Sequence, residues 1–228
     1  MFDEGAEATP PSTIARVRRY NRPTTVKYDN AVKMAREIGI IPEGDSIHTL
    51  VSGNFIFGDL IEAYLTEHDL CAHEMIIAVL SLSQENVDSL RNLQMGGYVG
   101  RMGLIVSDFF FSHYRATGVK YICEELGQGR FTFAAAGIHT KVVLMKGDGF
   151  SLVLSGSANL RSSRNVEQFA IDHSPELYTF HREWMATILN QYTATHQSLR
   201  GSELWQTLQE PANAAASPNG GKATRRKR

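Results

Sequence analysis

The sequence of 228 residues has little cysteine, no long apolar run and almost no net charge. Its two cysteines, Cys71 and Cys123, form no Cys-x-x-Cys pair, which argues against a disulfide framework and favours a reducing compartment. The N-terminus is acidic and lacks the apolar run of a signal peptide. No segment approaches the roughly 20 apolar residues that span a bilayer. We therefore expect a soluble, cytoplasmic protein without stable membrane association.

The formal net charge of −1 hides an uneven distribution. Residues 11–28 and residues 211–228 each carry five basic residues and no acidic residue. Residues 29–210, by contrast, hold 13 basic and 21 acidic residues. The chain is thus an acidic body with two basic segments, which can contact a polyanion. Solubility or local order explains each basic segment equally well.

We expect the chain to divide into a basic N-terminal arm (1–29), a globular domain (30–208) and a disordered basic C-terminal tail (209–228). Within the domain, strand-like and helix-like patterns alternate. The predicted strands are 46–53, 73–83, 101–111, 130–138, 139–145, 150–156 and 165–171, and the predicted helices are 30–39, 57–68, 85–94, 112–127 and 175–192. This alternation predicts an α/β fold with a mixed, largely parallel sheet sandwiched by helices.

Three short polar motifs lie close together in the second half of the domain. They are His139-Thr140-Lys141, then Gly156-Ser157-Ala158-Asn159, then Glu167. If residues 139–145 form a strand, its pleat places His139 and Lys141 on one face. A hairpin through the Lys-Gly-Asp-Gly turn at 146–149 brings the first two motifs together if the pairing register permits it.

Together these groups suit a phosphodiester site that needs no metal. A neutral imidazole is a nucleophile and can also move a proton near neutral pH. A lysine ammonium and an asparagine amide can hold the non-bridging oxygens of a phosphate. A carboxylate can fix the tautomer of an imidazole, a glycine allows close backbone approach and a serine adds a donor.

The combination of His-x-Lys, Gly-Ser-x-Asn and a downstream Glu resembles the signature of the phospholipase D superfamily. The resemblance covers about residues 46–190, where the order of strands and helices also fits one half of that fold. It implies that His139 attacks phosphorus and forms a phosphohistidine. It also implies that Lys141 and Asn159 bind the phosphate oxygens, that Ser157 supports the site and that Glu167 orients a histidine.

The resemblance further implies a homodimer, because family enzymes use two histidines and this chain has a single His-x-Lys motif. A composite site would then lie at a twofold axis. One position departs from the family pattern: Lys146 stands where an acidic residue is expected, and Asp148 follows two residues later. A hairpin three residues longer than the family pattern explains both differences. Whether Asp148 replaces the family residue is left open.

Two further groups of residues are candidates for binding. Arg161 and Arg164 follow the second motif and suit flanking phosphates, although a solvated face explains them equally well. His68, Cys71 and His73 have a spacing that suggests zinc, but the sequence shows no fourth ligand. We therefore expect neither a metal nor another cofactor.

The leading hypothesis is a metal-independent phosphodiesterase that acts as a nuclease on DNA or RNA and works as a homodimer. Phosphate contacts from Lys and Arg dominate nucleic-acid affinity, and the basic segments supply such residues. Two alternatives remain open at this point. One keeps the chemistry with a phospholipid substrate. The other is a catalytically silent nucleic-acid-binding protein with the same fold, for which Lys146 is the motive.

Overall fold

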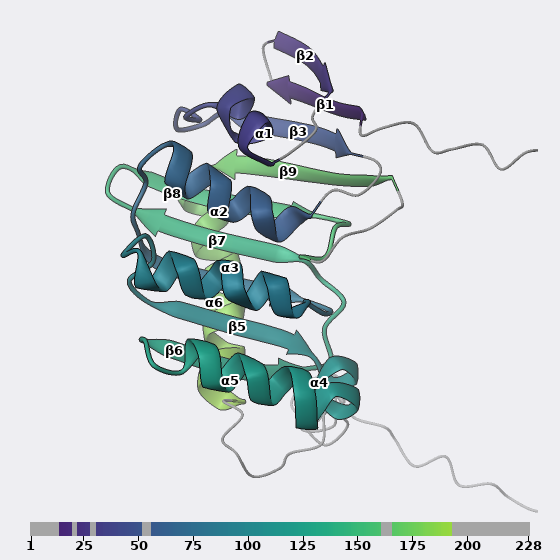
Figure 1. Cartoon of the computed structure of the whole chain (residues 1–228). Helices are drawn as coiled ribbons and strands as arrows, with labels where there is room; N and C mark the ends of the chain where they lie inside the picture. The colour runs from purple at the N-terminus through teal and green to yellow at the C-terminus, as the bar shows by residue number, and fades with distance from the viewer. Residues whose placement is uncertain (1–13, 20–21, 28–30, 52–55, 161–165, 193–228) are drawn as a thin grey trace, which may run out of the picture.

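One sheet of nine strands organises the chain (Figure 1). The computed structural model describes residues 14–19, 22–27, 31–51, 56–160 and 166–192, and for the first two ranges it describes the backbone alone. The strands are β1 Ile14–Arg19, β2 Arg22–Lys27, β3 Ser46–Val51, β4 Ala72–Val79, β5 Met102–Ser107, β6 Phe131–Ala136, β7 Val142–Gly147, β8 Phe150–Gly156 and β9 Glu167–His173. The helices are α1 Ala31–Ile38, α2 Phe57–Glu67, α3 Gln84–Met95, α4 Asp108–Tyr114, the π-helical turn η1 Arg115–Val119, α5 Lys120–Leu126 and α6 Pro175–Gln191.

The strand order in the sheet is β2-β1-β3-β9-β8-β7-β4-β5-β6. The predicted α/β fold with a mixed sheet between helices is confirmed, but the sheet is less parallel than expected. Only β4, β5 and β6 pair in parallel, whereas every other neighbouring pair is antiparallel. The reason is that the chain returns through hairpin β7–β8 and through β9 instead of through further helical crossovers.

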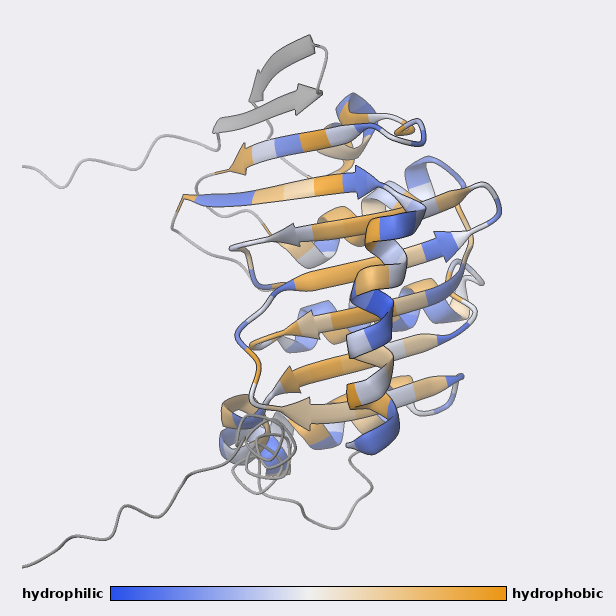
Figure 2. Ribbon diagram, turned by 180° about the vertical axis from the view of Figure 1, so that it is seen from behind, coloured by the Kyte–Doolittle hydropathy of each residue, from blue (hydrophilic) through white to orange (hydrophobic). Residues whose placement is uncertain are grey.

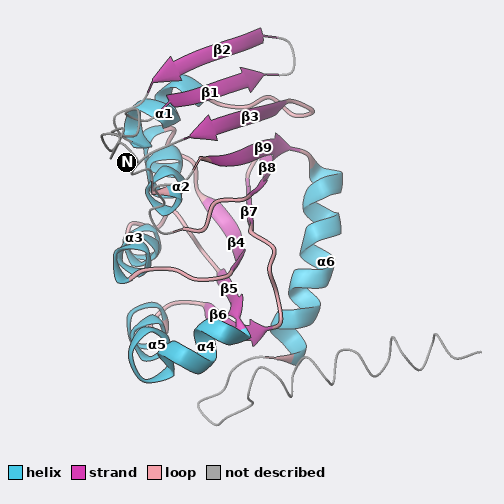
Figure 3. Ribbon diagram, turned by 90° about the vertical axis from the view of Figure 1, so that its right-hand side faces the viewer, coloured by secondary structure: helices cyan, strands magenta, loops and turns pink. Residues whose placement is uncertain are grey.

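Helices cover both faces of the sheet (Figures 2 and 3). Helices α1, α2, α3 and α5 lie side by side on one face, and α6 alone crosses the other. Helix α6 contacts β8, β7, β4, β5 and β6. This arrangement leaves β3 and β9 without extensive helix contact on the α6 face.

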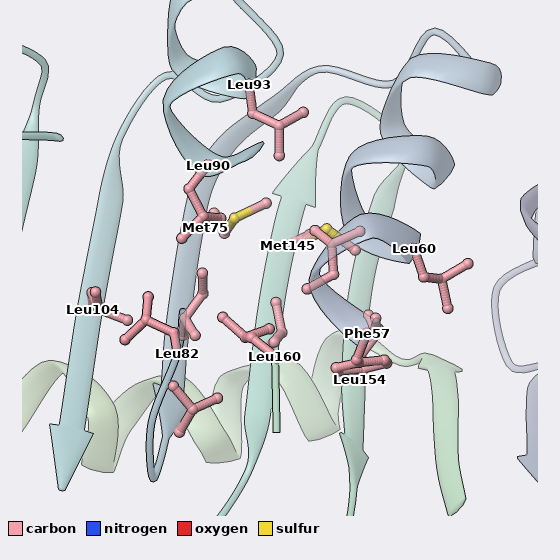
Figure 4. Packing of buried hydrophobic residues seen from close by; sticks show 14 of the residues in the cluster. Phe57, Leu60, Met75, Leu82, Leu90, Leu93, Leu104, Met145, Leu154 and Leu160 are labelled. Carbon is pink, nitrogen blue, oxygen red and sulfur yellow. The ribbon is translucent and has the colours of Figure 1, made fainter. Parts of the chain in front are cut away.

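The larger core lies between the sheet and the row of helices (Figure 4). Leu60, Leu90 and Leu93 point from α2 and α3 toward Met75 and Met145 on the strands. All of these side chains are almost completely buried, and each contributes roughly 1.5–3 kcal/mol to folding through removal of its apolar surface from water. A smaller core under α6 includes Tyr178 and Met185.

Local capping sets where several helices begin. Ser83 caps α3 in a capping box with Asn86, and Ser174 caps α6 ahead of Pro175. Ser107 accepts a hydrogen bond from the backbone N–H of Phe110, so the chain turns into α4 at Asp108. The predicted strand 101–111 was therefore too long, because its aromatic end lies in a helix.

The basic segment near the N-terminus supplies the last two strands on one side of the sheet. Strands β1 and β2 pair with each other, and β1 also pairs with β3. The C-terminal tail predicted for 209–228 lies outside the described residues. None of the helices in the described part of the chain is long and apolar enough to cross a membrane.

Candidate active site

The three motifs meet at one edge of the sheet, on the right in Figure 1 and facing the viewer in Figure 3. Strand β7 begins directly after Lys141, β8 ends at Gly156 and β9 begins at Glu167. Because β7 pairs with β8 and β8 pairs with β9, these ends are neighbours. The hairpin through residues 146–149 and its pairing register thus bring the motifs together as the sequence predicts.

His139 and Lys141 do not lie on a strand, which corrects the sequence interpretation. They belong to the connection between β6 and β7, where Lys141 Nζ donates a hydrogen bond to the backbone carbonyl of His139 at 3.0 Å. The backbone N–H of Gly156 donates to the Lys141 carbonyl at 3.3 Å, which ties this connection to the end of β8. Local hydrogen bonds, and not a strand pleat, therefore set the relative positions of the two residues.

The imidazole of His139 is exposed, and no hydrogen bond to it is found within the described ranges. Lys141 is partly buried, and this burial lowers the pKa of its ammonium group. The nearby carboxylate of Glu167 acts in the opposite direction and raises that pKa. The site thus combines an accessible imidazole with an ammonium group that has lost part of its hydration.

Ser157 is held in place by β9. Its hydroxyl donates to the carboxylate of Glu167 and accepts from the backbone N–H of Gln168 at 3.0 Å. The backbone N–H of Ser157 donates to the Gln168 carbonyl at 2.9 Å. Glu167 therefore contacts a serine, and among the described residues it has no hydrogen bond to a histidine. The sequence analysis did not identify the role of Gln168. Its only signal in the sequence is its position next to Glu167.

Asn159 carries an unusual amide. Its Oδ1 atom is buried and has no hydrogen-bond partner in the described part of the chain. A buried polar atom without a partner costs about 1–3 kcal/mol. Rotation of the amide by 180° exchanges its oxygen and its NH₂ group, so the same position can offer two donors. Asn159 follows Ser157 by two residues after the end of β8, and the NH₂ group of an amide is a donor that suits an anion.

Gly156 is required by a close approach between strands. A Cβ atom at this position would lie 2.2 Å from the Gln168 carbonyl oxygen and 2.7 Å from the Cα atom of Phe169. Any side chain would force β8 away from β9 and would move Ser157 with it. The glycine in the second motif therefore has a packing reason as well as the access to a ligand that the sequence suggested.

Asp148 does not take part in this site. It lies in the turn at the far end of hairpin β7–β8, where it accepts a hydrogen bond from His73 Nε2 at 2.8 Å. The hairpin spans about five residues at roughly 3.3 Å each, which separates Asp148 from Lys141. Asp148 therefore does not replace the acidic residue of the family pattern.

The remaining candidate ligands are separated or lie elsewhere. Arg161 and Arg164 fall outside the described residues. His68 hydrogen bonds to the carbonyl of Ala35, while His73 contacts Asp148, so the pattern around Cys71 forms no joint site. Within the described ranges, no group of three or more His, Cys, Asp or Glu side chains is placed to hold a metal ion.

A groove of about 430 Å³ adjoins the site on the face that α6 leaves open. It runs across β3, β9 and β8 and is lined by His48, Leu50, Ser155, Gly156 and Gln168, among others. At the next strand, Arg16 and Arg18 occupy the register positions opposite Leu50 and His48. The groove therefore runs from the strand ends that carry the candidate active site to the basic N-terminal segment.

Comparisons with known proteins give solved structures only. No protein-family model and no curated protein matches the chain. A phospholipase D family member, Nuc from Salmonella typhimurium, is 16% identical over 64% of this chain and 96% of its own, with a TM-score of 0.47. NucT from Helicobacter pylori is 15% identical over 54% of this chain and 84% of its own, with a TM-score of 0.45.

A third similar structure is the phosphatidylserine synthase of Haemophilus influenzae Rd KW20. It is 13% identical over 74% of this chain and 46% of its own, with a TM-score of 0.44. The solved structures that are similar to this chain thus include a phospholipase D family member.

Proposed function

We propose that this chain is a metal-independent phosphodiesterase of the phospholipase D type that cleaves nucleic acid. The observation that supports this most is the meeting of His139, Lys141, Ser157, Asn159 and Glu167 at one edge of the sheet. In that setting the amide NH₂ group of Asn159 and the partly buried ammonium group of Lys141 suit the charge of a phosphodiester.

In the proposed reaction, a ring nitrogen of His139 attacks phosphorus. A P–N bond forms, the P–O bond to the leaving alkoxide breaks, and a second histidine donates the proton that the alkoxide needs. Water then attacks the phosphohistidine, gives a proton back to the second histidine and releases His139. Lys141 and Asn159 hold the non-bridging oxygens in both steps. Ser157 supports the site, and Glu167 holds Ser157 through the hydrogen bond to its carboxylate.

The second histidine requires a second copy of the chain. The sequence has a single His-x-Lys motif, whereas the proposed reaction needs two histidines. We therefore propose a homodimer in which His139 of each copy contributes to one composite site across a twofold axis.

Nucleic acid is the proposed substrate because of the charge around the site. Arg161 and Arg164 follow Asn159 in the sequence, and Arg16 and Arg18 occupy strand positions beside the open groove. Basic residues that contact phosphates supply most of the affinity for a nucleic-acid backbone.

The deciding experiment compares wild type, His139→Ala and His73→Ala in EDTA, with DNA, RNA and phospholipid vesicles as substrates. His73 is a matched control because it is also exposed but lies at the other end of the sheet. We expect wild type and His73→Ala to cleave nucleic acid, and His139→Ala to lose about 10⁴-fold or more. Acid-labile phosphate trapped on His139 by mass spectrometry would identify the intermediate.

Three outcomes would contradict the proposal. Full cleavage by His139→Ala removes the nucleophile from the mechanism. Hydrolysis of vesicles without cleavage of nucleic acid favours the phospholipid substrate. Binding of nucleic acid without turnover from acidic to neutral pH favours a silent binding protein.

Subunit exchange tests the composite site. Mixing wild type with an excess of His139→Ala should reduce the activity per wild-type chain, because each mixed dimer has one histidine. Light scattering should give the mass of a dimer. A monomer with full activity would contradict the composite site.

A further inference from the structure

A second cavity opens at the same edge of the sheet as the candidate active site. It has a volume of about 280 Å³ and lies between the connection from β4 to α3 and the segment α4–η1–α5. Its lining residues are Ser81, Leu82, Ser83, Gln84, Val87, Phe110, Tyr114, Thr117, Gly118, Tyr121 and Ile122. We call this cavity the edge pocket.

The register of the sheet places the edge pocket near the motifs. Strand β4 pairs with β7 up to Ala78 and Val142, so the chain leaves β4 beside the point where it enters β7. The pocket begins three residues later, at Ser81. Strand β5, which leads into α4, is one strand farther from Lys141. Since neighbouring strands are about 4.8 Å apart, the ends of β4 and β5 lie within roughly 10 Å of the start of β7 along the sheet, and the pocket opens beside them.

The pocket has a built aromatic wall. The rings of Phe110 and Tyr114 lie 5.2 Å apart at an angle of 31°. Tyr121 is fixed by a hydrogen bond of 2.6 Å from its hydroxyl to Asp88. Gly118 keeps the space open, because a Cβ atom there would lie 3.2 Å from the ring of Phe110. This glycine belongs to the π-helical turn η1, an element that is rare and often marks functional sites.

The lining chemistry suits a flat, neutral and polar ligand. None of the lining residues is an acid, a lysine, an arginine or a histidine, so the pocket is unsuited to a phosphate. Tyr114 is 48% exposed and can stack on a ring. Ser81, Gln84 and Thr117 add hydroxyl and amide groups that can donate to and accept from the edge of a heterocycle. The volume is below the range of about 300–1,000 Å³ that is typical of drug-sized ligands, and it fits one ring system.

We propose that the edge pocket binds an unpaired nucleobase next to the scissile phosphate, so that the preferred substrate is single-stranded nucleic acid. The proposal deepens the proposed function and rests on it. A base inside a duplex cannot enter such a pocket without being unpaired and unstacked, whereas the bases of a single strand are free to stack on aromatic side chains. Lys141 and Asn159 hold the phosphate while the pocket holds the base.

The test measures binding in the inactive His139→Ala background. The probe is a short single strand with one 2-aminopurine, beside the same strand with an abasic site and a duplex of equal length. Tyr114→Ala should weaken binding of the single strand roughly tenfold and abolish the quenching of 2-aminopurine, because stacking is lost. Binding of the abasic strand and of the duplex should not change. Tyr114→Phe should restore both signals.

Phe109→Ala is the matched control, because Phe109 is an exposed aromatic residue of the same helix but does not line the pocket. We expect it to behave as the parent. Equal losses on the base-containing and abasic strands, or no loss in Tyr114→Ala, would overturn the proposal. Displacement of the base by glycerophosphodiesters would overturn it in favour of a lipid headgroup.

The result separates the pocket from the catalysis. Base-dependent binding by a protein that cleaves nothing keeps the pocket and refutes the phosphodiesterase. Cleavage of single strands and duplexes with equal efficiency, unaffected by Tyr114→Ala, keeps the phosphodiesterase and refutes the pocket.

Discussion

At the end of the sheet where β4 begins, Glu74 is almost completely buried and accepts hydrogen bonds from Arg101, Arg182 and Tyr178 at 2.5–3.1 Å. At the end where β7 begins, the Asn159 amide oxygen is buried without a partner in the described residues, and His139 is exposed. Buried polar groups usually have partners, so the first arrangement is what stability requires, whereas the second leaves a buried oxygen unsatisfied, as Thr49 Oγ1 and Asn86 Nδ2 also are within the described residues.

Titration behaviour differs between these two ends as well. Burial alone raises the pKa of Glu74, but hydrogen bonds from Arg182, Tyr178 and Arg101 outweigh it and lower the pKa to about 2. At the other end, burial lowers the pKa of Lys141, and the single opposing carboxylate of Glu167 does not restore it. Neighbouring side chains therefore stabilise the charge of Glu74 at one end of the sheet, whereas the charge of Lys141 at the other end is left for a ligand.

The sharpest test of this difference replaces two lysines at opposite ends of β7, Lys141 directly before the strand and Lys146 within it. Lys141→Met should lower kcat/KM about 10²- to 10³-fold, because it removes a donor to the phosphate. Lys146 lies at the other end of β7 with its ammonium 5.5 Å from the ring centre of Tyr178. Lys146→Met should keep full activity. Steady-state cleavage rates decide, and similar losses in both variants would contradict the assignment of the two ends.

Gly156→Ala should show that the active-site end also has a structural requirement. The added Cβ would collide with the backbone of Gln168 and Phe169, and such overpacking costs about 3 kcal/mol. Gly149→Ala is the control in the same hairpin, where nothing lies within 4 Å but φ is +76°. Urea unfolding should give the smaller loss for Gly149→Ala and loss of activity for Gly156→Ala alone. Equal stability of Gly156→Ala and wild type would contradict the close approach.

Glu74→Gln should affect stability and leave the chemistry intact. The loss at neutral pH should be about 2 kcal/mol, because charge-assisted hydrogen bonds are removed from an almost buried group. The pKa of Glu74 is lowered on folding, so its contribution is present above the ordinary value of 4.5 and disappears as pH falls toward about 2. Unfolding curves of both proteins should therefore converge over that interval, and a constant difference would contradict this account.

Asp148→Asn should have the smallest effect of the four. Its ion pair with His73 joins two largely exposed side chains, and such pairs contribute little. Cleavage rates and the urea midpoint should stay close to those of wild type. A clear loss of activity would mean that Asp148 replaces the family acid after all, contrary to its position in the hairpin.

The sequence predicted most elements because apolar periodicity reports burial. It did not predict strand direction, since a buried run such as β4 has the same pattern in parallel and antiparallel pairs. The sequence also predicted a strand that includes His139 and Lys141. A side-chain pattern cannot show that the hydrogen-bonded pairing of this strand begins only at Val142. The motif spacing still predicted which segments meet, because a hairpin places the start of its first strand beside the end of its second strand.

The partners of Glu74 and the edge pocket had no comparable signal. Tyr178 and Arg182 reach Glu74 from more than 100 positions away in the chain. The pocket combines two segments that are separated by β5 and that carry no family motif. Contacts of this kind follow from the tertiary arrangement of α6 and α4, which local patterns do not contain.

The pairing of β3 with β9 has a consequence for how the molecule assembles. Ile47 lies opposite Ile171 in this pair of strands. The two strands can therefore pair only after most of the chain has been synthesised and the long segment between them has been ordered. Non-local pairing of this kind slows folding because loop entropy is lost before contacts compensate for it. Glu167, Gln168 and their contacts with Ser157 belong to that late strand. We expect the strand ends that carry the candidate site to take their final arrangement late in folding, once β9 has paired with β3 and β8.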